Sequence, residues 1–443
     1  MPQAIQSLPV CKSFFQRLLL MALLEEGERR FRYPVGLELP QDLRVLLQAL
    51  HVLGGSYERD EKAALLQVRG RGAGPLRGRL DLGSNATLLR FSIGICTVLG
   101  GELELDGSPQ LRRRPIGPLC ALVQDLGAHF SFSQTPGHLP LHFRAPGLRS
   151  RGTWGTPIVV DPSAGTQGAS GLLLGLAALG RGAHLHCPSA KGDTHPYLLL
   201  TGEALEVMGY PACRSEAGTL VLPSRSPRPQ PGGRSPAGGD IHVPRDPSAL
   251  AFALVVAALQ SRECFFPGPL LGVSHPDLRI LEDLREMGHE CEATPEGLRF
   301  RGRGAGAGDL CIQDLDLRPD SFPPLSLLCV FREGVHVLGD APRLRIKESD
   351  RIGALAQGFR SLGIEVQERE GGLRIRGGWT PKGEGPKELD PRGDHRMAMV
   401  FLLLSRLGGL HTRVLGESCV EKSWPSFPRF LKEVGVGDGR TED

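Results

Sequence analysis

Apolar residues recur at helical spacing in stretches along the whole chain, and six of these stretches end in an apolar residue followed by glycine. The six glycines are 72 to 82 residues apart. A glycine at this point is typical of a helix C-terminus, where the backbone turns into the left-handed conformation. The pattern therefore predicts six helices in six similar units. The pairs are Leu53-Gly54, Leu126-Gly127, Met208-Gly209, Met287-Gly288, Leu362-Gly363 and Val434-Gly435.

The clearest copies of the unit are residues 281–302 and 356–377. In both, apolar and polar residues alternate after the glycine, on either side of a glycine-containing turn, which predicts a β-hairpin. A unit of about 75 residues is longer than the usual solenoid repeat, so we expect the units to pack around shared cores. The 443 residues are too many for one ordinary core. We therefore predict two domains of three units each.

Residues 223–240 are rich in proline, glycine and serine and lie between the third and fourth units. This stretch is either a hinge or a long surface loop. Because it coincides with the midpoint of the repeat, we place a domain boundary there.

Composition excludes several functions. The formal charge is only +3, aromatic residues make up 5% of the chain and no basic run occurs, which disfavours nucleic-acid binding. The ten cysteines form no Cys-x-x-Cys pair, so we expect reduced structural thiols, without a metal site, in a cytoplasmic protein. Apolar residues 18–24 follow Arg17 and precede a charged segment, which favours a helix over a signal peptide. No apolar run approaches the roughly 20 residues that a membrane span needs.

Residues 344–351 carry five charged side chains immediately before an apolar helical pattern. We predict Ser349 as the N-cap of that helix. Lys347 and Arg351 would then lie at a helix N-terminus, where the helix dipole disfavours cations. A bound anion would offset this repulsion. Glu348 adds a carboxylate, so the segment predicts a site for a phosphorylated acid.

Other predicted helix starts are also polar. Lys12, Ser13 and Arg17 gather at one of them, and Asp394 is a predicted N-cap just before Arg396. Further polar starts are residues 83–87, 163–167 and 246–248. One such start is only a cap, but several of them around one cleft would attract anionic ligands. The chain has no P-loop motif. Glu348 and Asp320 could both transfer protons, although Asp320 taken alone is a typical turn residue.

Four segments carry a resemblance to a known family: LRIKESDR (344–351), DHRMAM (394–399), CVEKSWP (419–425) and RRRPIGPL (112–119). They resemble 5-enolpyruvylshikimate-3-phosphate synthases, in order and along essentially the whole chain. The resemblance implies an α/β fold of two domains, each with three βαβαββ-type repeats around a pseudo-threefold axis. The chain would cross between the domains twice. Residues 11–240 would form the shikimate 3-phosphate domain, and residues 1–10 with 241–443 the domain of the catalytic carboxylates and phosphoenolpyruvate.

The resemblance also implies an activity without metal or cofactor. The family transfers the enolpyruvyl group of phosphoenolpyruvate to the 5-hydroxyl of shikimate 3-phosphate, a step in aromatic amino-acid biosynthesis. Asp320, helped by Lys347, would take the hydroxyl proton, Glu348 would exchange a proton at the methylene carbon, and Lys12 would contact phosphoenolpyruvate. Arg114, Arg351, Arg396 and Lys422 would bind phosphoenolpyruvate; Ser13, Arg17, Thr166, Gln167 and Thr194 would bind shikimate 3-phosphate, with Tyr197 nearby. We expect a monomer without nucleic-acid or membrane partners.

Several positions depart from the family's motifs. The usual Gly-Asn-Ala-Gly-Thr reads Gly83-Ser84-Asn85-Ala86-Thr87, and Gly165 replaces a serine of the usual Ser-Ser-Gln. The serine before the Pro-Tyr element is Thr194, and Arg245 and Ala249 replace a glycine and a serine. The methyl group of Ala86 lies where the family's glycine allows close approach of a ligand. We therefore predict weaker inhibition by glyphosate and some loss of phosphoenolpyruvate affinity.

Two alternatives stay open at this point. The first is the related transferase that acts on UDP-N-acetylglucosamine. That enzyme uses a cysteine acid in a loop, whereas residues 112–118 contain no cysteine. The second is a non-catalytic relative, suggested by Ser84, Gly165 and Arg245. Against it, every charged residue of the implied chemistry is present, and function depends on the site rather than on the fold.

Overall fold

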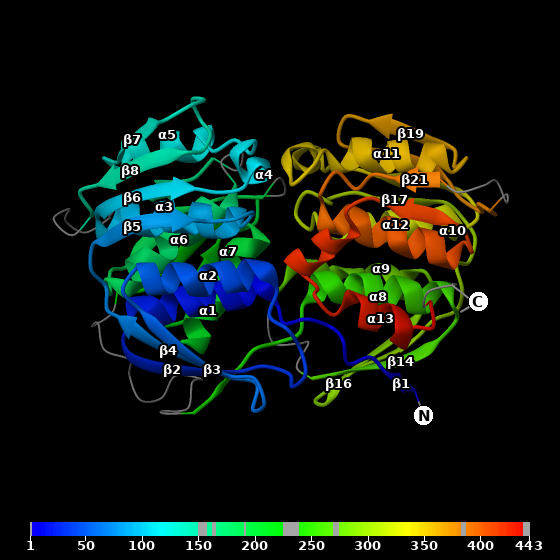
Figure 1. The fold of residues 1–443 in the computed structure, drawn as a ribbon, viewed down its shortest axis with the longest axis horizontal. Helices are drawn as coiled ribbons and strands as arrows, with labels where there is room; N and C mark the ends of the chain where they lie inside the picture. The colour runs from blue at the N-terminus through cyan, green and yellow to red at the C-terminus, as the bar shows by residue number, and fades with distance from the viewer. Residues whose placement is uncertain are drawn as a thin grey trace.

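The structure is a computed structural model that describes residues 2–148, 157–161, 165–189, 192–224, 239–268, 274–381 and 387–436. Most of the predicted boundary segment, residues 225–238, lies outside the described residues. Two α/β lobes lie side by side (Figure 1). Each has its own hydrophobic core: the first runs from Val10 to Val243, and the second combines Ile5 and Leu8 with residues from Ala249 to Val436.

The repeating unit is complete in the first lobe. Strand β5 (Leu76–Asp81), helix α3 (Ala86–Leu99) and strand β6 (Gly101–Asp106) form a parallel βαβ motif. Helix α5 (Gly117–Asp125) then leads into the hairpin β7 (His129–Phe132) and β8 (Leu141–Ala145). The sheet order β5-β6-β8-β7 places β8 antiparallel between β6 and β7. This is the predicted βαβαββ unit, with the short helix α4 (Pro109–Arg112) added.

The same strand order recurs in the other four-stranded sheets. The first lobe also contains α1 (Lys12–Leu24), β2 (Glu26–Arg32), α2 (Gln41–Val52), β3 (Ser56–Asp60), β4 (Leu65–Arg71), β9 (Ile158–Val159), α6 (Thr166–Ala178), β10 (Ala183–His186), α7 (Pro196–Val207), β11 (Arg214–Glu216), β12 (Thr219–Leu222) and β13 (Ile241–His242).

The second lobe repeats the plan, and its last described sheet has two strands, β21-β22. Its elements are β1 (Gln3–Ala4), α8 (Pro247–Leu259), β14 (Glu263–Pro267), η2 (Pro276–Arg279), α9 (Ile280–Glu286), β15 (Glu290–Thr294), β16 (Gly297–Arg301), β17 (Leu310–Ile312), α10 (Phe322–Phe331), β18 (Val335–Leu338), η3 (Pro342–Ile346), α11 (Arg351–Ser361), β19 (Val366–Arg369), β20 (Gly372–Arg376), β21 (Lys387–Leu389), α12 (His395–Leu407), β22 (Thr412–Val414), η4 (Glu417–Lys422) and α13 (Phe427–Glu433).

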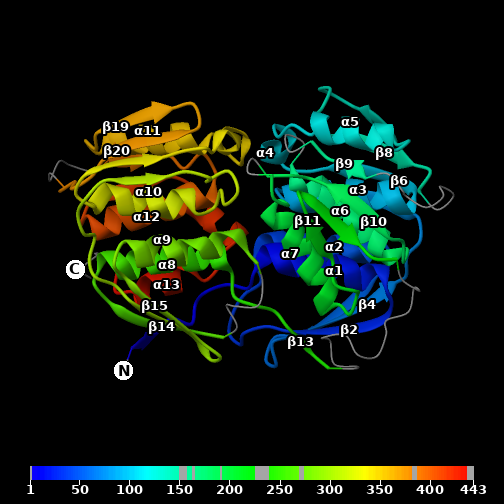
Figure 2. The same cartoon turned by 180° about the vertical axis from the view of Figure 1, so that it is seen from behind.

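Helices α3, α6 and α8 lie buried inside the lobes, whereas α2 and α5 keep one exposed face (Figures 1 and 2). Helix α8 is apolar on all sides, and its residues from Pro247 to Ala258 are buried, as expected of a central helix. In the first lobe, α3 and α6 pack closely because glycines face each other. A Cβ atom on Gly94 would lie 2.7 Å from the carbonyl oxygen of Gly168. The buried helices direct their N-termini to the inner surface of the lobe, where the site is formed.

All six predicted helix ends are confirmed. Each of the six glycines has a positive φ between 64° and 93°. The predicted crossing of the chain between lobes is visible in the strand pairing, because β1 pairs with β14 of the second lobe and β13 pairs with β2 of the first. The predicted boundaries need a correction: Val10, Ile241 and Val243 belong to the first core. The pairing of β13 with β2 places this segment in the first lobe. The composition of a segment does not reveal its strand pairing.

All ten cysteines are free thiols and lie among the described residues. No helix in the described part of the chain is long and apolar enough to cross a membrane.

Candidate active site

A cleft between the two lobes is lined by most of the predicted site residues. The first lobe contributes the starts of α1, α3 and α6, and the second contributes η3, the start of α11 and the end of η4. Fifteen further residues complete the lining, and two of the predicted residues, Thr194 and Arg396, are not part of it. The predicted residues that line the cleft are Lys12, Ser13, Arg17, Ala86, Arg114, Thr166, Gln167, Asp320, Lys347, Glu348, Arg351 and Lys422.

Three helix starts at the cleft are capped by polar side chains, whereas α1 and α6 have no side-chain cap. Asn85 caps α3, and Asp394 caps α12 as predicted. Helix α11 is capped by Asp350, whose carboxylate accepts from the backbone N–H of Gly353 at 3.0 Å, so the prediction of Ser349 as the cap is wrong by one residue. The Ser349 hydroxyl instead donates to Asp394 at 3.3 Å. Arg351 is therefore the first residue of α11.

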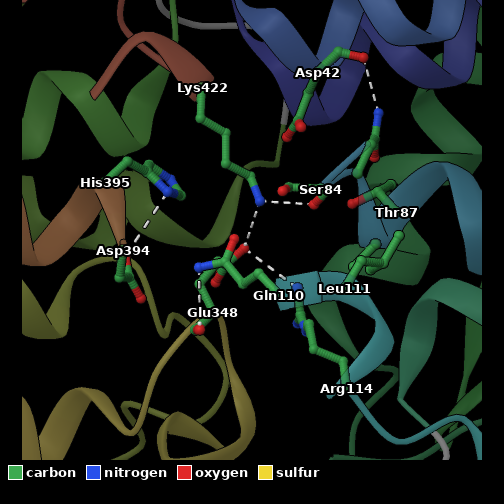
Figure 3. Close-up of polar contacts among 12 residues, drawn as sticks. Asp42, Ser84, Thr87, Gln110, Leu111, Arg114, Glu348, Asp394, His395 and Lys422 are labelled. Carbon is green, nitrogen blue, oxygen red and sulfur yellow. Dashed lines mark hydrogen bonds and ion pairs between the residues drawn. The ribbon is translucent and has the colours of Figure 1, made fainter. Parts of the chain in front are cut away.

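Glu348 lies between three cations from both lobes, two of which, Arg114 and Lys422, are labelled in Figure 3. Its carboxylate is 3.2 Å from Arg114, 3.3 Å from Lys422 and 3.1 Å from Arg351. Burial alone would raise the pKa of Glu348, but these cations, with Arg114 foremost, hold it well below its usual range. The carboxylate is therefore ionised in the unliganded cleft.

Arg351 connects the acidic groups of the second lobe. Its guanidinium donates to Asp394 at 2.8 Å, to Asp320 at 2.7 Å and to Glu348 at 3.1 Å. Although burial opposes the charge, these carboxylates raise the pKa of Arg351 well above its usual value. The cation predicted at a helix N-terminus is thus stabilised by three carboxylates of the chain itself.

Asp320 is held by two arginines. Besides Arg351, the Arg396 guanidinium donates to it at 3.3 Å from α12. Burial raises the pKa of Asp320, but Arg396 and Arg351 outweigh this effect and hold the pKa well below its usual range. Arg396 does not line the cleft itself, and it contacts the site by its hydrogen bond to Asp320. Its Nε and Nη1 atoms are buried without a hydrogen-bond partner among the described residues.

The two lysines of the site differ in environment. Lys12 pairs with Asp42 at 2.7 Å; burial lowers the pKa of this lysine, but Asp42 more than offsets the effect and raises it. Burial lowers the pKa of Lys347 to about 8, against an opposing effect of Asp320. Lys347 is therefore the site cation whose charge changes near neutral pH.

The predicted shikimate 3-phosphate residues meet at the starts of α1, α6 and α7. Arg17 donates to the Thr201 hydroxyl at 2.8 Å and to the carbonyl of Tyr197 at 3.1 Å. Gln167 donates to Thr87 at 2.9 Å. The Thr194 hydroxyl accepts from Ser215 at 2.9 Å and lies outside the lining of the cleft, where His195 and Tyr197 appear instead.

Sequence reasoning missed several charged or polar groups of the cleft. Most of them stand outside the quoted motifs, and only their positions at helix starts could have suggested Asp42 and His195. His395 lies within the motif at 394–399, directly after the N-cap Asp394, but was given no role. Burial is the main cause that lowers the pKa of His395 well below its usual value, and the neighbouring Arg396 and Lys12 lower it further. The imidazole of His395 is therefore neutral. The missed residues are Asp42, Arg90, Gln110, His195, Asp316, Arg343 and His395.

Gln110 connects the lobes directly. From α4 its side-chain amide donates to the backbone carbonyls of Glu348 at 3.2 Å and Gly393 at 3.0 Å (Figure 3). Lys422 adds a further inter-lobe hydrogen bond, to the carbonyl of Ser84 at 2.7 Å. The lobes are therefore in contact, and charges from both of them face one cleft.

Comparison with known proteins shows the family of the chain. The sequence model of the family described as EPSP synthase (3-phosphoshikimate 1-carboxyvinyltransferase) matches residues 4–431. The chain belongs to the EPSP synthase family. It is 31% identical over 435 residues to the 3-phosphoshikimate 1-carboxyvinyltransferase of Paraburkholderia phytofirmans, covering 96% of this chain and 95% of the relative. The enzyme of the same name from Methanopyrus kandleri is 32% identical over 435 residues, covering 97% and 95%.

Solved structures show the same fold. EPSP synthase from Acinetobacter baumannii superimposes with a TM-score of 0.72 at 24% identity, covering 98% of both chains. The enolpyruvyl transferase NikO from Streptomyces tendae gives 0.67 at 15% identity, covering 98% of this chain and 96% of that one. The family recognised from the four motifs and the two-domain α/β fold are thereby confirmed.

Two of the departures from the EPSP synthase motifs, Asn85 and Arg245, have structural roles here. Asn85 donates to Gln16 and to the carbonyl of Asp42, both at 2.8 Å, while its oxygen caps α3. Arg245 donates to the carbonyls of Gln6, at 2.9 Å, and Leu8, and so joins the two segments where the chain crosses between lobes. These two side chains fix the helix starts and the crossing rather than contact the cleft.

The described residues contain no group of three or more histidine, cysteine or acidic side chains arranged to hold a metal ion.

Proposed function

We propose that this chain transfers the enolpyruvyl group of phosphoenolpyruvate to the 5-hydroxyl of shikimate 3-phosphate and releases phosphate. One observation carries the proposal in detail: Asp320 and Glu348 are both bound to Arg351 in a cleft that receives cations from both lobes. Membership in the EPSP synthase family supplies the reaction. We further propose that the protein acts as a monomer in the cytoplasm, since one chain contains both walls of the cleft.

The substrates divide the cleft between them. We assign phosphoenolpyruvate to the end where Arg114, Lys422 and Arg351 surround Glu348, with Lys12 nearby on α1. Arginine suits bidentate contacts to phosphate and carboxylate, and lysine supplies a compact charge. Shikimate 3-phosphate is assigned to the other end, beside Arg17, Thr166 and Gln167. Asp320 lies between the two ends, held by Arg351 and Arg396.

The reaction needs proton transfer at oxygen and at carbon. In the addition step, Asp320 takes the proton of the 5-hydroxyl while the oxygen forms a bond to C2 of phosphoenolpyruvate and a proton is added to the methylene carbon. In the elimination step, the bond from C2 to the phosphate oxygen breaks and a proton leaves the methyl carbon. Glu348 is the group that gives and takes the carbon proton, and Lys347 stabilises the negative charge that develops on the 5-oxygen.

Substrate binding prepares Glu348 for this role. The unliganded carboxylate is held ionised by Arg114, Lys422 and Arg351. A phosphoenolpyruvate anion competes for the same cations, and its own charge disfavours a second anion beside it. Both effects raise the pKa of Glu348 and allow it to carry the proton that the methylene carbon needs. Closure of the lobes excludes water from this exchange.

The test is phosphate release from phosphoenolpyruvate with and without shikimate 3-phosphate, with the product identified by phosphorus NMR. We expect release only in the presence of shikimate 3-phosphate. Release with UDP-N-acetylglucosamine instead would support the alternative transferase. Binding of both ligands without release would support a non-catalytic relative.

A further inference from the structure

A buried carboxylate lies next to Asp320 and takes no part in the proposed proton transfers. Asp277, in η2 of the second lobe, is fully buried. Its carboxylate accepts from the hydroxyl of Ser248 at 2.5 Å and from the hydroxyl of Ser321 at 2.9 Å. No lysine or arginine among the described residues forms an ion pair with it. Burial of a carboxylate without a cationic partner costs free energy, so this group calls for a role.

Ser321 connects this carboxylate to the base of the reaction. It directly follows Asp320 and is the N-cap residue of α10, but its hydroxyl makes no cap hydrogen bond and donates to Asp277 instead. Its backbone N–H donates to the carbonyl of Arg318 at 3.0 Å, and its carbonyl accepts from the N–H of Leu325 at 3.1 Å. The side chain and both backbone groups of Ser321 are therefore fixed, and with them the backbone beside Asp320.

Asp277 is itself held from two sides. Ser248, its other hydroxyl donor, lies in the first turn of the central helix α8. The Nδ1 atom of His275 accepts from the backbone N–H of Asp277 at 3.3 Å. The ring of His275 packs edge-on against Tyr197 of the first lobe, with 5.7 Å between the ring centroids. Because Tyr197 lines the cleft, the carboxylate lies between the core of the second lobe and the shikimate 3-phosphate end of the cleft.

The pKa of Asp277 indicates how near the base lies. Burial raises this pKa, and the charge of Asp320 raises it further, although His275 and the two hydroxyl donors oppose both effects. A like charge has such an effect only at short range. Asp277 is therefore close to Asp320 in space, in addition to being connected to it through Ser321.

We propose that Asp277 is a positioning residue for Asp320: it holds Ser321, and through Ser321 the backbone that directs the Asp320 carboxylate to the 5-hydroxyl of shikimate 3-phosphate. The inference rests on the proposed function, since it concerns the base of that reaction. In the unliganded cleft, Arg351 also holds Asp320, at 2.7 Å. Phosphoenolpyruvate competes for Arg351 when it binds, so the contact between Asp277 and Ser321 keeps the base in place during turnover.

The test compares Asp277→Asn and Ser321→Ala with the wild type. Ser248→Ala is the matched control, because it removes the other hydroxyl from the same carboxylate but is not adjacent to the base. Ser321→Thr keeps the hydroxyl and tests rescue. The measurements are Tm, kcat and KM for both substrates, and crystal structures with shikimate 3-phosphate and inorganic phosphate, a pair that does not react. Since Ser321→Ala leaves Asp277 in place, it remains decisive if Asp277→Asn does not fold.

We expect Ser321→Ala and Asp277→Asn to lower kcat roughly 10- to 100-fold, the effect of displacing a catalytic group by about 1 Å. Both KM values should change less than about threefold, and Ser321→Thr should restore most of kcat. Ser248→Ala should lower Tm about as much as Ser321→Ala, with a much smaller loss of kcat. Equal losses of kcat in the two alanine variants, or no loss in Ser321→Ala, would overturn the proposal.

The crystal structures separate this proposal from the proposed function. We expect the Asp320 carboxylate to move by more than about 0.5 Å, the tolerance of a catalytic arrangement, in Ser321→Ala but not in Ser248→Ala. Absence of turnover in the wild type would reject the proposed function. The position of Asp320 would still decide the role of Asp277, and an identical position in both alanine variants would reject it.

Discussion

Arg114 and Glu348 form an ion pair across the cleft, with the guanidinium 3.2 Å from the carboxylate. The two residues are 234 positions apart in the chain and belong to different lobes. In the unliganded protein, Glu348 is paired with the cations that we assign to phosphoenolpyruvate. Binding of phosphoenolpyruvate therefore has to displace this pair, which links substrate binding to the protonation of Glu348.

Replacing Glu348 by glutamine tests its role in proton transfer. We expect kcat to fall by roughly 100- to 10,000-fold, the usual contribution of a general acid–base group. Affinity for shikimate 3-phosphate should change less than about threefold, because the Glu348 carboxylate contacts the cations that we assign to phosphoenolpyruvate. Steady-state kinetics and calorimetry measure the two effects. Glu370→Gln, an exposed site in the same lobe, is the control, and near-normal turnover of Glu348→Gln would contradict the assignment.

The methyl group of Ala86 should weaken glyphosate inhibition. Ala86 is the first residue of α3 and lines the cleft. One additional carbon atom in a tight site changes binding by about tenfold or more. We expect Ala86→Gly to lower the glyphosate concentration for half inhibition and the KM for phosphoenolpyruvate by about this factor. Ala121→Gly, exposed on α5, controls for glycine in a helix; equal inhibition of wild type and Ala86→Gly would reject the prediction.

Lys347 should impose an alkaline limit on the reaction. Burial lowers its pKa to about 8. A lysine is charged below its pKa, so the free enzyme loses this cation as the pH rises through 8. Since kcat/KM reports ionisations of the free enzyme, we expect kcat/KM for shikimate 3-phosphate to fall about tenfold per pH unit above that point. Lys347→Arg should move the fall to higher pH, and an unchanged pH profile would contradict the role of Lys347.

Gln110 should stabilise the closed arrangement of the lobes. Gln110→Ala removes two inter-lobe hydrogen bonds, each of which contributes about 1 kcal/mol. Gln110→Glu would place a carboxylate against two carbonyl oxygens and should oppose closure more strongly. We expect KM for both substrates to rise, and the radius of gyration in small-angle scattering to increase. Both effects should be larger for Gln110→Glu than for Gln110→Ala. Gln124→Ala, an exposed site on α5, should behave as wild type, and unchanged values in Gln110→Glu would exclude the contact.

The sequence predicted the repeating unit well because its signals are local. Helical spacing of apolar residues and a glycine at each helix end depend on neighbours within a few residues. The cap of α11 shows the limit of such signals. Ser349 and Asp350 are both good N-caps, and the contact of Ser349 with Asp394, 45 residues later, leaves Asp350 as the cap.

Charged motifs located most of the site, but not the contacts that give each residue its role. Lys347 and Glu348 are adjacent in the sequence. One has a pKa lowered by burial, whereas the pKa of the other is lowered by cations from both lobes in spite of burial. This difference depends on which side chains the folded chain brings near each of them, and adjacent positions in a motif do not specify it.

The sequence by itself determined the family, the six units and the segments that supply the carboxylates and most of the cations, because each is written in a short run of residues. Only the tertiary structure decided that Gln110 joins Glu348 across 238 positions and that Arg343 faces His195 across 148. These contacts arise when two separately packed lobes meet. Their geometry depends on how the lobes dock and on where β1 and β13 cross between them, and no local pattern of residues records either.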